Sequence, residues 1–131
     1  MNPLADLKTF IDASGVSSVS WPVRLAILNT DSAQAIYLSE AGGFPFDTLG
    51  RENINAKFQL LVRGPAEEFE ACLTKWQEVF DLLQDAQDNP GSPALLPGWT
   101  FIQCINSRPN TWWDSEGRAC LTTEFRYKKA R

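Results

Sequence analysis

The sequence predicts an α+β protein in which two helices pack on one face of a twisted, mainly antiparallel sheet of four or five strands. Three observations lead to this prediction. One long segment has apolar residues at helical spacing, several shorter segments alternate between apolar and polar residues, and the predicted order is helix, strands, long helix and two strands. No internal repeat is visible, so residues 1–131 are expected to form a single domain.

The first predicted helix runs from about Pro3 to Ala13. Asn2 is a candidate N-cap, proline is favourable at the first helical position, and Gly15 can end the helix in a left-handed conformation. The apolar stripe of this helix consists of Leu4, Leu7, Phe10 and Ile11.

Two short β-prone runs follow, Val23–Asn29 and Ala35–Ser39. The turn residues between them, Thr30–Ser32, allow either a hairpin or one broken strand. Residues Glu40–Asn55 contain three glycines and a proline, which predicts a long loop, and such a loop in a compact domain usually has a function. Lys57–Arg63 then alternates between apolar and polar residues, as in a half-buried strand.

A helix of about twenty residues is predicted from Gly64-Pro65 to roughly Ala86. Its second face is acidic, which is typical of a solvated helix surface. The alternative for this face is a metal site formed by Glu78, Asp81 and Asp85. The core-facing stripe consists of Phe69, Cys72, Leu73, Trp76, Val79, Phe80 and Leu83.

In the last third of the chain, the sequence predicts two antiparallel strands joined by a long hairpin loop. In the first of them, Trp99, Phe101 and Ile105 are assigned to one face. The elements in order are the connector Asn89–Gly98, the strand Trp99–Ser107, the loop Arg108–Gly117 and the strand Arg118–Lys129.

The sheet face opposite the helices is predicted to be only partly polar. Leu61, Ile102 and Cys104 are assigned to this face, which makes it a candidate for covering by another subunit. The alternative is that the first helix or the long loop covers it.

The composition argues against an enzyme. The chain has no histidine, which removes the common nucleophile systems and every metal site that needs imidazole. Its three cysteines are too far apart for a Cys-x-x-Cys site and are expected to be small buried hydrophobes. No glycine-rich phosphate loop is present. We therefore expect no catalytic residue, no cofactor and no metal.

The charge and hydropathy limit the partners and the compartment. The net charge of −4 gives the whole surface no general affinity for nucleic acid or for an anionic membrane. Neither a membrane-spanning run nor a signal-peptide pattern is visible, so the expected compartment is the cytoplasm or an assembly built there.

Five motifs follow one another along the chain. They are Gly42-Gly43-Phe44-Pro45, the strand Phe58–Arg63, the helix stripe Phe69–Leu83, the turn Asp114-Ser115-Glu116-Gly117-Arg118 and the closing Glu124–Lys128. In order and spacing these motifs resemble the tail terminator or minor capsid proteins of long-tailed bacteriophages. The segment Asp47–Asn55 is longer than this resemblance predicts.

The resemblance implies a ring, usually a hexamer, that caps the tail tube, ends its polymerisation and joins the tail to the neck of the head. It implies the tail tube protein and a neck protein as partners, DNA passing through the pore without specific binding, no membrane, and a place in the virion after assembly in the host cytoplasm. The nearest alternative is a neck protein that closes the head. Another is a small nucleic-acid-binding module that uses the basic C-terminal strand with Trp112, Trp113 and Tyr127 as stacking groups.

The candidate interface residues are chosen for their chemistry. Of the adjacent Trp112 and Trp113, one is expected to anchor its loop and the other to be a contact hot spot. Arg63 is expected to pair with an acidic group at the start of the long helix or with another subunit. The basic C-terminal strand would let one subunit meet the acidic helix of the next, or these charges are ordinary surface charge. The candidate protein-interface residues are Phe44, Phe46, Arg51, Arg63, Trp112, Trp113, Asp114, Arg118 and Arg126.

Overall fold

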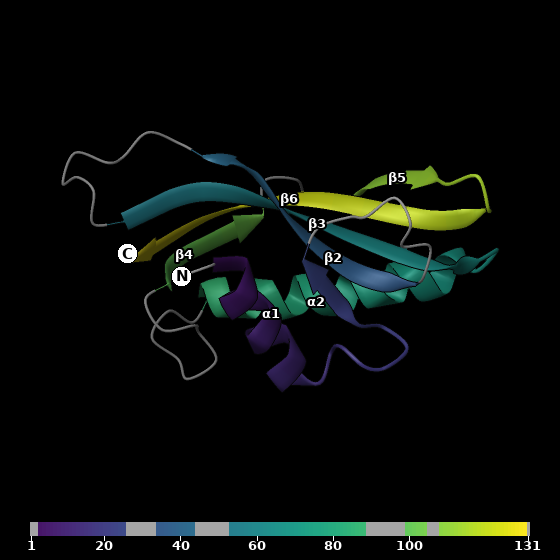
Figure 1. The fold of residues 1–131 in the computed structure, drawn as a ribbon, viewed down its shortest axis with the longest axis horizontal. Coiled ribbons are helices and arrows are strands. Elements are labelled where there is room, and N and C mark those ends of the chain that lie inside the picture. The colour runs from purple at the N-terminus through teal and green to yellow at the C-terminus, as the bar shows by residue number, and fades with distance from the viewer. Residues whose placement is uncertain (1–2, 26–33, 44–52, 89–98, 105–107, 131) are drawn as a thin grey trace.

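A computed structural model describes residues 3–25, 34–43, 53–88, 99–104 and 108–130. Within these ranges two helices lie on one side of a six-stranded, mostly antiparallel sheet (Figure 1), so the predicted α+β class is confirmed. The strand order is β1-β2-β3-β6-β4, and β5 also pairs with β6. The elements are α1 (Pro3–Ser14), β1 (Val23–Leu25), β2 (Ala35–Gly43), β3 (Asn53–Ala66), α2 (Phe69–Asp88), β4 (Trp99–Cys104), β5 (Asn110–Trp113) and β6 (Arg118–Ala130).

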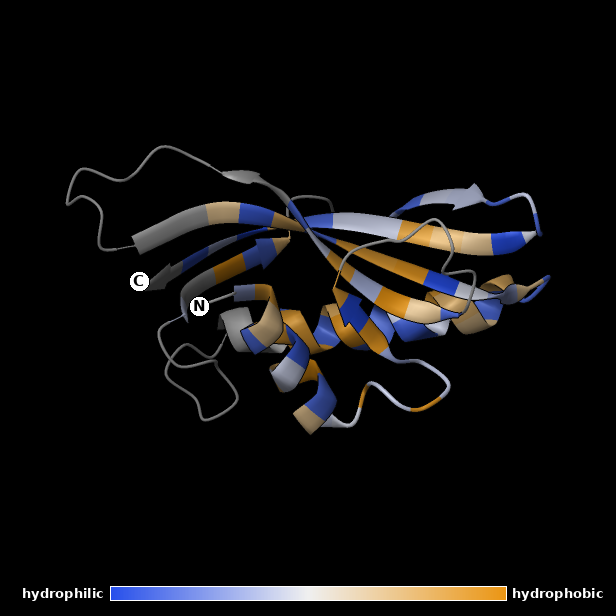
Figure 2. Cartoon of the chain, in the orientation of Figure 1, coloured by the Kyte–Doolittle hydropathy of each residue, from blue (hydrophilic) through white to orange (hydrophobic). Residues whose placement is uncertain are grey.

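The main core lies between the two helices and the sheet, where Figure 2 shows hydrophobic residues on both helices and on the central strands. Alternate residues of β3 face the helices, as predicted, and Phe58 stacks on Phe125 of β6 with ring centroids 5.1 Å apart. From α2, Trp76 is buried and its Nε1–H donates to Thr123 Oγ1 at 2.7 Å. The apolar stripes of the two helices thus pack against the sheet to form the core.

The first helix ends as the sequence predicts. Gly15 has a φ of +86°, and its N–H donates to the carbonyl of Asp12 at 3.4 Å. Glycine adopts this left-handed conformation without the Cβ penalty that other residues bear. The expected N-cap, Asn2, lies outside the described residues.

The expected hairpin or broken strand at the start of the sheet is wrong, because β1 and β2 run parallel. Val23 pairs with Ile36, and the Ile36 N–H donates to the carbonyl of Pro22 at 2.9 Å. Both Val23 and Ile36 belong to the main core. Alternation of apolar residues puts the same side chains inside for either strand direction, so the pattern carries no signal for direction.

Both ends of the long loop predicted at Glu40–Asn55 are strand in the structure. Strand β2 continues to Gly43 and β3 already begins at Asn53, where it pairs with Ala130. Backbone pairing with β6 holds Asn53–Asn55 in the sheet, although the glycines and the proline just before them predicted a loop. Phe44, Phe46 and Arg51 lie outside the described residues.

Gly64-Pro65 does not open the long helix. It belongs to β3, which crosses a bulge between Arg63 and Ala66 and pairs there with β6 before α2 begins at Phe69. A Cβ on Gly64 would lie 2.6 Å from the Cβ of Cys72, so glycine is needed here for the close approach of α2 to β3. The bulge and this contact explain the later helix start.

Strand β4 pairs antiparallel with β6 as predicted, but its faces differ from the prediction. A register shift between Trp99 and Phe101 places Trp99 and Ile102 together in the main core, and Cys104 packs against that core. Ile102 and Cys104 therefore lie on the face opposite Leu61, and the three residues do not share one surface.

The face opposite the helices carries a smaller buried cluster of Ala35, Tyr37 and Leu61. The first helix does not cover it, because α1 lies with α2 on the other side (Figure 1). The first helix is therefore excluded as the element that covers this face.

Candidate protein interface

Four of the predicted interface residues meet at one end of the sheet, in the hairpin of β5 and β6. The segment predicted as a loop contains a real strand, in which Trp112 pairs with Cys120 and Trp113 with Ala119. Asp114 and Arg118 close the hairpin with a tight turn. Arg126 lies further along β6, near the opposite end of the sheet.

The carboxylate of Asp114 organises this turn. Its Oδ1 accepts the backbone N–H groups of Glu116 at 2.9 Å and of Arg118 at 3.0 Å, and its Oδ2 accepts Arg118 Nε–H at 2.8 Å. Gly117 adopts a φ of +75°, and its N–H donates to the Asp114 carbonyl at 3.1 Å. The Asp-x-x-Gly-Arg spacing thus supplies the acceptor, the left-handed residue and the cation that this turn needs.

These bonds determine the ionisation of Asp114. Burial alone would raise the pKa of this carboxyl, but the backbone and side-chain hydrogen bonds from Arg118 and Glu116 outweigh it and hold the pKa below its ordinary value of 3.8. Asp114 is therefore a carboxylate throughout the physiological range and interacts with the nearby cations.

Arg63 joins the same carboxylate from the neighbouring strand. Its Nε lies 3.7 Å from Asp114 Oδ2 and 3.5 Å from Cys120 Sγ, and its guanidinium lies 5.5 Å from the ring centroid of Tyr37. Burial lowers the pKa of Arg63, but Cys120, Tyr37 and Asp114 outweigh this effect and hold it above its ordinary value. The expected pairing of Arg63 with the start of the long helix is wrong, because strand alternation places its side chain on the opposite face of the sheet.

We call Arg63, Asp114 and Arg118 the charged triad. Their side chains are 11%, 14% and 13% exposed, so all three are largely removed from water. Glu116 adds a second anion, 3.1 Å from Arg118 Nη2. Buried charges of this kind need their partners, so the triad acts as internal support for the hairpin.

Both tryptophans remain open to solvent. Trp112 is 41% and Trp113 is 59% exposed, so the expectation that one of them anchors the loop is wrong. The charged triad supplies the anchor instead. Because successive strand residues alternate, Trp112 lies on the face of Cys120, whereas Trp113 lies on the helix side with Ala119.

Trp113 is part of an exposed apolar surface. Its ring centroid lies 6.1 Å from that of Phe69, the first residue of α2, and both Phe69 and Leu73 are more than a third exposed. We call Phe69, Leu73 and Trp113 the aromatic patch. The helical spacing assigned Phe69 and Leu73 to the core, but the first turn of α2 lies at the end of the sheet, beside the four-residue β5.

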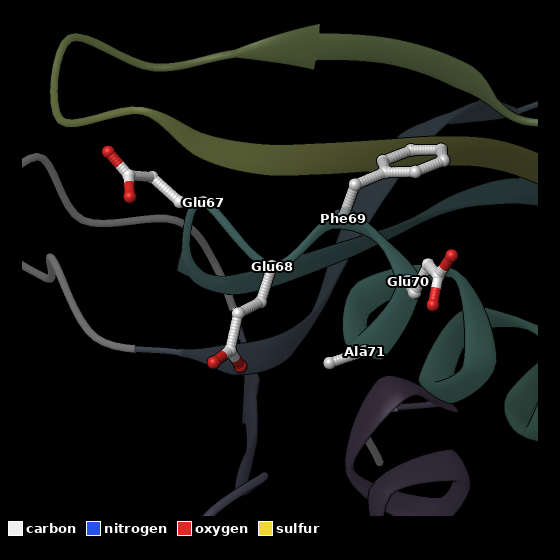
Figure 3. A pocket seen from close by; sticks show the side chains of 5 residues that line it. All are labelled: Glu67, Glu68, Phe69, Glu70 and Ala71. Carbon is white, nitrogen blue, oxygen red and sulfur yellow. The ribbon is translucent and has the colours of Figure 1, made fainter.

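Three exposed carboxylates lie at the start of α2, next to Phe69 in the sequence. Figure 3 shows the open pocket at the start of α2, lined by Glu67–Ala71, with Phe69 directed toward the β5–β6 strands. The carboxylates of Glu67, Glu68 and Glu70 diverge from one another in this view, and all three residues are exposed. This end of the molecule therefore combines exposed aromatic side chains with exposed carboxylates that do not form one cluster.

Cys72 and the described part of the acidic helix face take part in ordinary packing and pairing. Burial raises the pKa of the Cys72 thiol to about 11, and Cys72 donates to the carbonyl of Val62 at 3.2 Å. Glu78 is paired with Lys75 at 2.7 Å, and Asp81 accepts from Gln77 at 2.8 Å. Among the described residues, no three Cys, Asp or Glu side chains cluster as metal ligands would.

The described geometry therefore favours binding through an exposed patch on a rigid support. Comparison of the chain with protein-family models and with curated proteins finds no match. No helix within the described ranges is long and apolar enough to cross a membrane.

Proposed function

We propose that the chain is the subunit of a hexameric ring that caps the tail tube of a long-tailed bacteriophage, ends its polymerisation and joins the tail to the neck. The observation that carries this proposal is the β5–β6 hairpin, where exposed tryptophans stand on a support fixed by the charged triad. Exposed aromatic side chains on a rigid element are typical of protein contacts.

The proposal is also supported by the place of the resemblance in the fold. Asp114-Ser115-Glu116-Gly117-Arg118, one of the motifs that resemble tail terminators, forms the turn between Trp113 and β6. A turn with fixed backbone bonds loses little entropy when a partner binds.

The proposed mechanism is binding alone. One surface of the ring covers the last ring of the tube and presents no template for another, and a second surface receives the neck. DNA passes through the pore without being bound, because a subunit with a net charge of −4 does not attract phosphates.

A nucleic-acid-binding module is less well supported by the geometry. Trp112 and Trp113 are exposed enough for base stacking, but Arg118 beside them is bound to Asp114 and Glu116. The remaining cations of β6, Arg126, Lys128 and Lys129, lie toward the other end of the strand. Stacking groups and phosphate contacts would normally line one groove.

Native mass spectrometry and electron microscopy of the purified protein test the proposal. We expect ring-shaped particles with six times the 14.7 kDa subunit mass, about 88 kDa. We also expect that the protein does not bind single-stranded DNA in the strongly salt-dependent way typical of phosphate contacts. A monomer or dimer that binds such DNA with a steep salt dependence would contradict the ring and favour the module.

To separate the tail cap from a neck protein, the ring is mixed with purified tail tubes and with DNA-filled heads. Binding to the tube end, with an arrest of tube growth, is the expected result. Binding to heads alone would show a head-closure protein instead.

A further inference from the structure

We infer that the subunits join edge to edge, with the outer edge of β5 of one copy pairing antiparallel with the outer edge of β1 of the next copy. One sheet would then continue from copy to copy around the ring. This inference rests on the proposed function and names the segments that would close the ring.

The outer edge of β5 carries backbone groups without partners. The Asp114 N–H donates to the carbonyl of Arg118 at 3.1 Å, and Trp113 pairs with Ala119 one step farther along the hairpin. Because hydrogen-bonded and non-hydrogen-bonded pairs alternate in an antiparallel ladder, the N–H and C=O groups of Trp113 and Thr111 point away from β6. Within the described ranges no hydrogen bond reaches these groups, and every residue of β5 is exposed. The strand also has none of the charged side chains that usually protect an open edge.

The strand at the opposite edge of the sheet, β1, is open in the same way. The Ile36 N–H donates to the carbonyl of Pro22, the residue before its pairing partner Val23. In a parallel ladder this pattern directs the N–H and C=O groups of Val23 and Leu25 away from β2. Among the residues that the structure describes, these outward groups have no hydrogen-bond partner either. The two strands cannot pair within one chain, because β2, β3 and β6 lie between them (Figure 1).

Exposed apolar side chains lie at the same two edges. Val19 is fully exposed in the segment that leads into β1, and Leu25 is 36% exposed within that strand. At the other edge the aromatic patch lies beside β5, and Trp112 is exposed on the opposite face. Together these residues are all of the large hydrophobic side chains that are exposed in the described part of the chain. Exposed apolar surface that is gathered in this way favours a protein contact.

The strand directions allow the two edges to pair between copies of the same orientation. β1 is parallel to β2, which is antiparallel to β3. β5 has the direction of β3, because both are antiparallel to β6. When one sheet continues into the next, β1 of one copy therefore runs antiparallel to β5 of its neighbour.

One antiparallel alignment satisfies the open residues of both strands. It places Val23 opposite Trp113 and Leu25 opposite Thr111, so that every outward N–H and C=O group of these residues has a partner. The side chains of all four lie on the helix side, because each of these residues belongs to the main core or pairs with a core residue in its own chain. Val23 and Leu25 of one copy would thus extend the apolar surface that begins with Trp113 and Phe69 of the other.

This alignment has two consequences for assembly. Within one chain the ladders place Thr111 level with Val23, so pairing of Val23 with Trp113 shifts the next copy by two residues, about 7 Å, along the strands. Closure of a sheet on itself requires such a stagger. Because the contact joins two different edges, it repeats until a ring closes or a filament grows, whereas pairing of β5 with itself would stop at a dimer.

Proline at an outward position tests the backbone pairing. Thr111→Pro and Leu25→Pro each remove an N–H group that points away from the sheet, so the pairing of β5 with β6 and of β1 with β2 is kept. We expect both variants to sediment as monomers at concentrations at which the wild type is a ring, with the assembly constant weakened at least tenfold. Thr111→Val and Leu25→Val keep the N–H group and are the matched controls, which should assemble like the wild type.

Mixing the two proline variants tests whether the contact joins two different edges. Each variant retains one intact edge, so an equimolar mixture should form a heterodimer of twice the 14.7 kDa subunit mass, about 29 kDa, and nothing larger. A proline variant that assembles like the wild type, or a mixture that stays monomeric, would overturn the edge pairing. A wild-type ring would in that case leave the proposed function standing, whereas a wild type that never assembles would remove both.

A disulfide tests the register and does not depend on the proline variants being folded. In the inferred alignment Arg24 lies opposite Trp112 at a non-hydrogen-bonded pair, with Cα atoms about 4.5 Å apart. Oxidation of Arg24→Cys/Trp112→Cys should therefore link the copies of the ring into a ladder on a denaturing gel. Arg24→Cys/Asn110→Cys, on the same face but two residues out of register, is the control and should not link. Linked dimers of Trp112→Cys alone would show that β5 pairs with itself and would overturn the inference, as would an intact ring of the first double variant that does not link.

Discussion

The helix-covered core and the β5–β6 hairpin use tryptophan in opposite ways. In the core, Trp76 is 4% exposed, stacks on Phe80 with centroids 5.0 Å apart and donates its N–H to Thr123. In the hairpin, Trp112 and Trp113 are largely exposed, and a set of ion pairs holds the backbone that carries them. Apolar burial therefore stabilises the first region, whereas charge pairing positions the second.

This difference teaches how an exposed aromatic residue can be kept in place. The side chains of the triad are only 11–14% exposed, yet the tryptophans beside them are open to solvent. Substitution of the core tryptophan should consequently lower stability, whereas substitution of the exposed hairpin tryptophans should leave it nearly unchanged.

The largest effect is expected for Trp76→Ala. This change leaves a cavity beside Phe80 and an unpaired hydroxyl on Thr123, so the free energy of unfolding should fall by about 3–5 kcal/mol. Urea unfolding followed by tryptophan fluorescence measures the change. The same substitution at Trp112 is the control and should cost less than about 1 kcal/mol. Equal losses at the two positions would erase the distinction between the regions.

Asp114→Ala should have the next largest effect. It leaves Arg63 and Arg118 without their shared carboxylate and removes the acceptor of two backbone N–H groups, so we expect a loss of about 2–3 kcal/mol. Thermal unfolding reports this loss. Ser115→Ala, in the same turn, is the matched control. If Asp114→Ala melts like the wild type, the triad does not support the hairpin.

The contribution of Asp114 should depend on pH. Its pKa is lowered in the folded protein, so its stabilisation is present in full above the unfolded value of about 4 and is lost as the pH falls through the folded value. The difference in unfolding free energy between wild type and Asp114→Asn should therefore be greatest near pH 7 and shrink below about pH 4. Asp12, whose pKa is also lowered, is present in both proteins and cancels. A difference that stays constant from pH 7 to pH 3 would contradict the ion pairing.

The smallest effect on stability is expected for Trp113→Ala. Most of this side chain is exposed, so its removal should cost less than about 1 kcal/mol of unfolding free energy. Differential scanning calorimetry measures this change. A large drop in melting temperature would show that Trp113 is part of the core.

Much of the fold follows from residue spacing, and the failures have physical causes. The alternation in β3 and β6 and most of the apolar stripe of α2 predict correctly which side chains face the core, because burial selects residues on one face; Phe69 and Leu73 are the exceptions. Bulges at Arg63/Ala66 and at Trp99/Phe101 shift the register by backbone geometry, which leaves no periodic signal in the sequence.

The candidate site was predictable in its members more than in its arrangement. Trp112, Trp113, Asp114 and Arg118 are close in sequence, so their gathering follows from the turn motif. Arg63 joins them only because β3 and β6 pair in one register, in which Arg63 lies opposite Cys120. The exposure of Phe69 depends on where α2 passes the end of the sheet, a tertiary property that helical spacing does not contain.

The central claim is that the β5–β6 hairpin carries a surface for assembly into a ring. Sedimentation analysis of wild type and Trp113→Ala at matched concentrations tests this claim most directly, with melting temperatures recorded on the same samples. We expect the wild type to sediment as a closed oligomer of about 88 kDa and the variant, with an unchanged melting temperature, as smaller species. A variant that melts normally and forms the same oligomer as the wild type would contradict the claim.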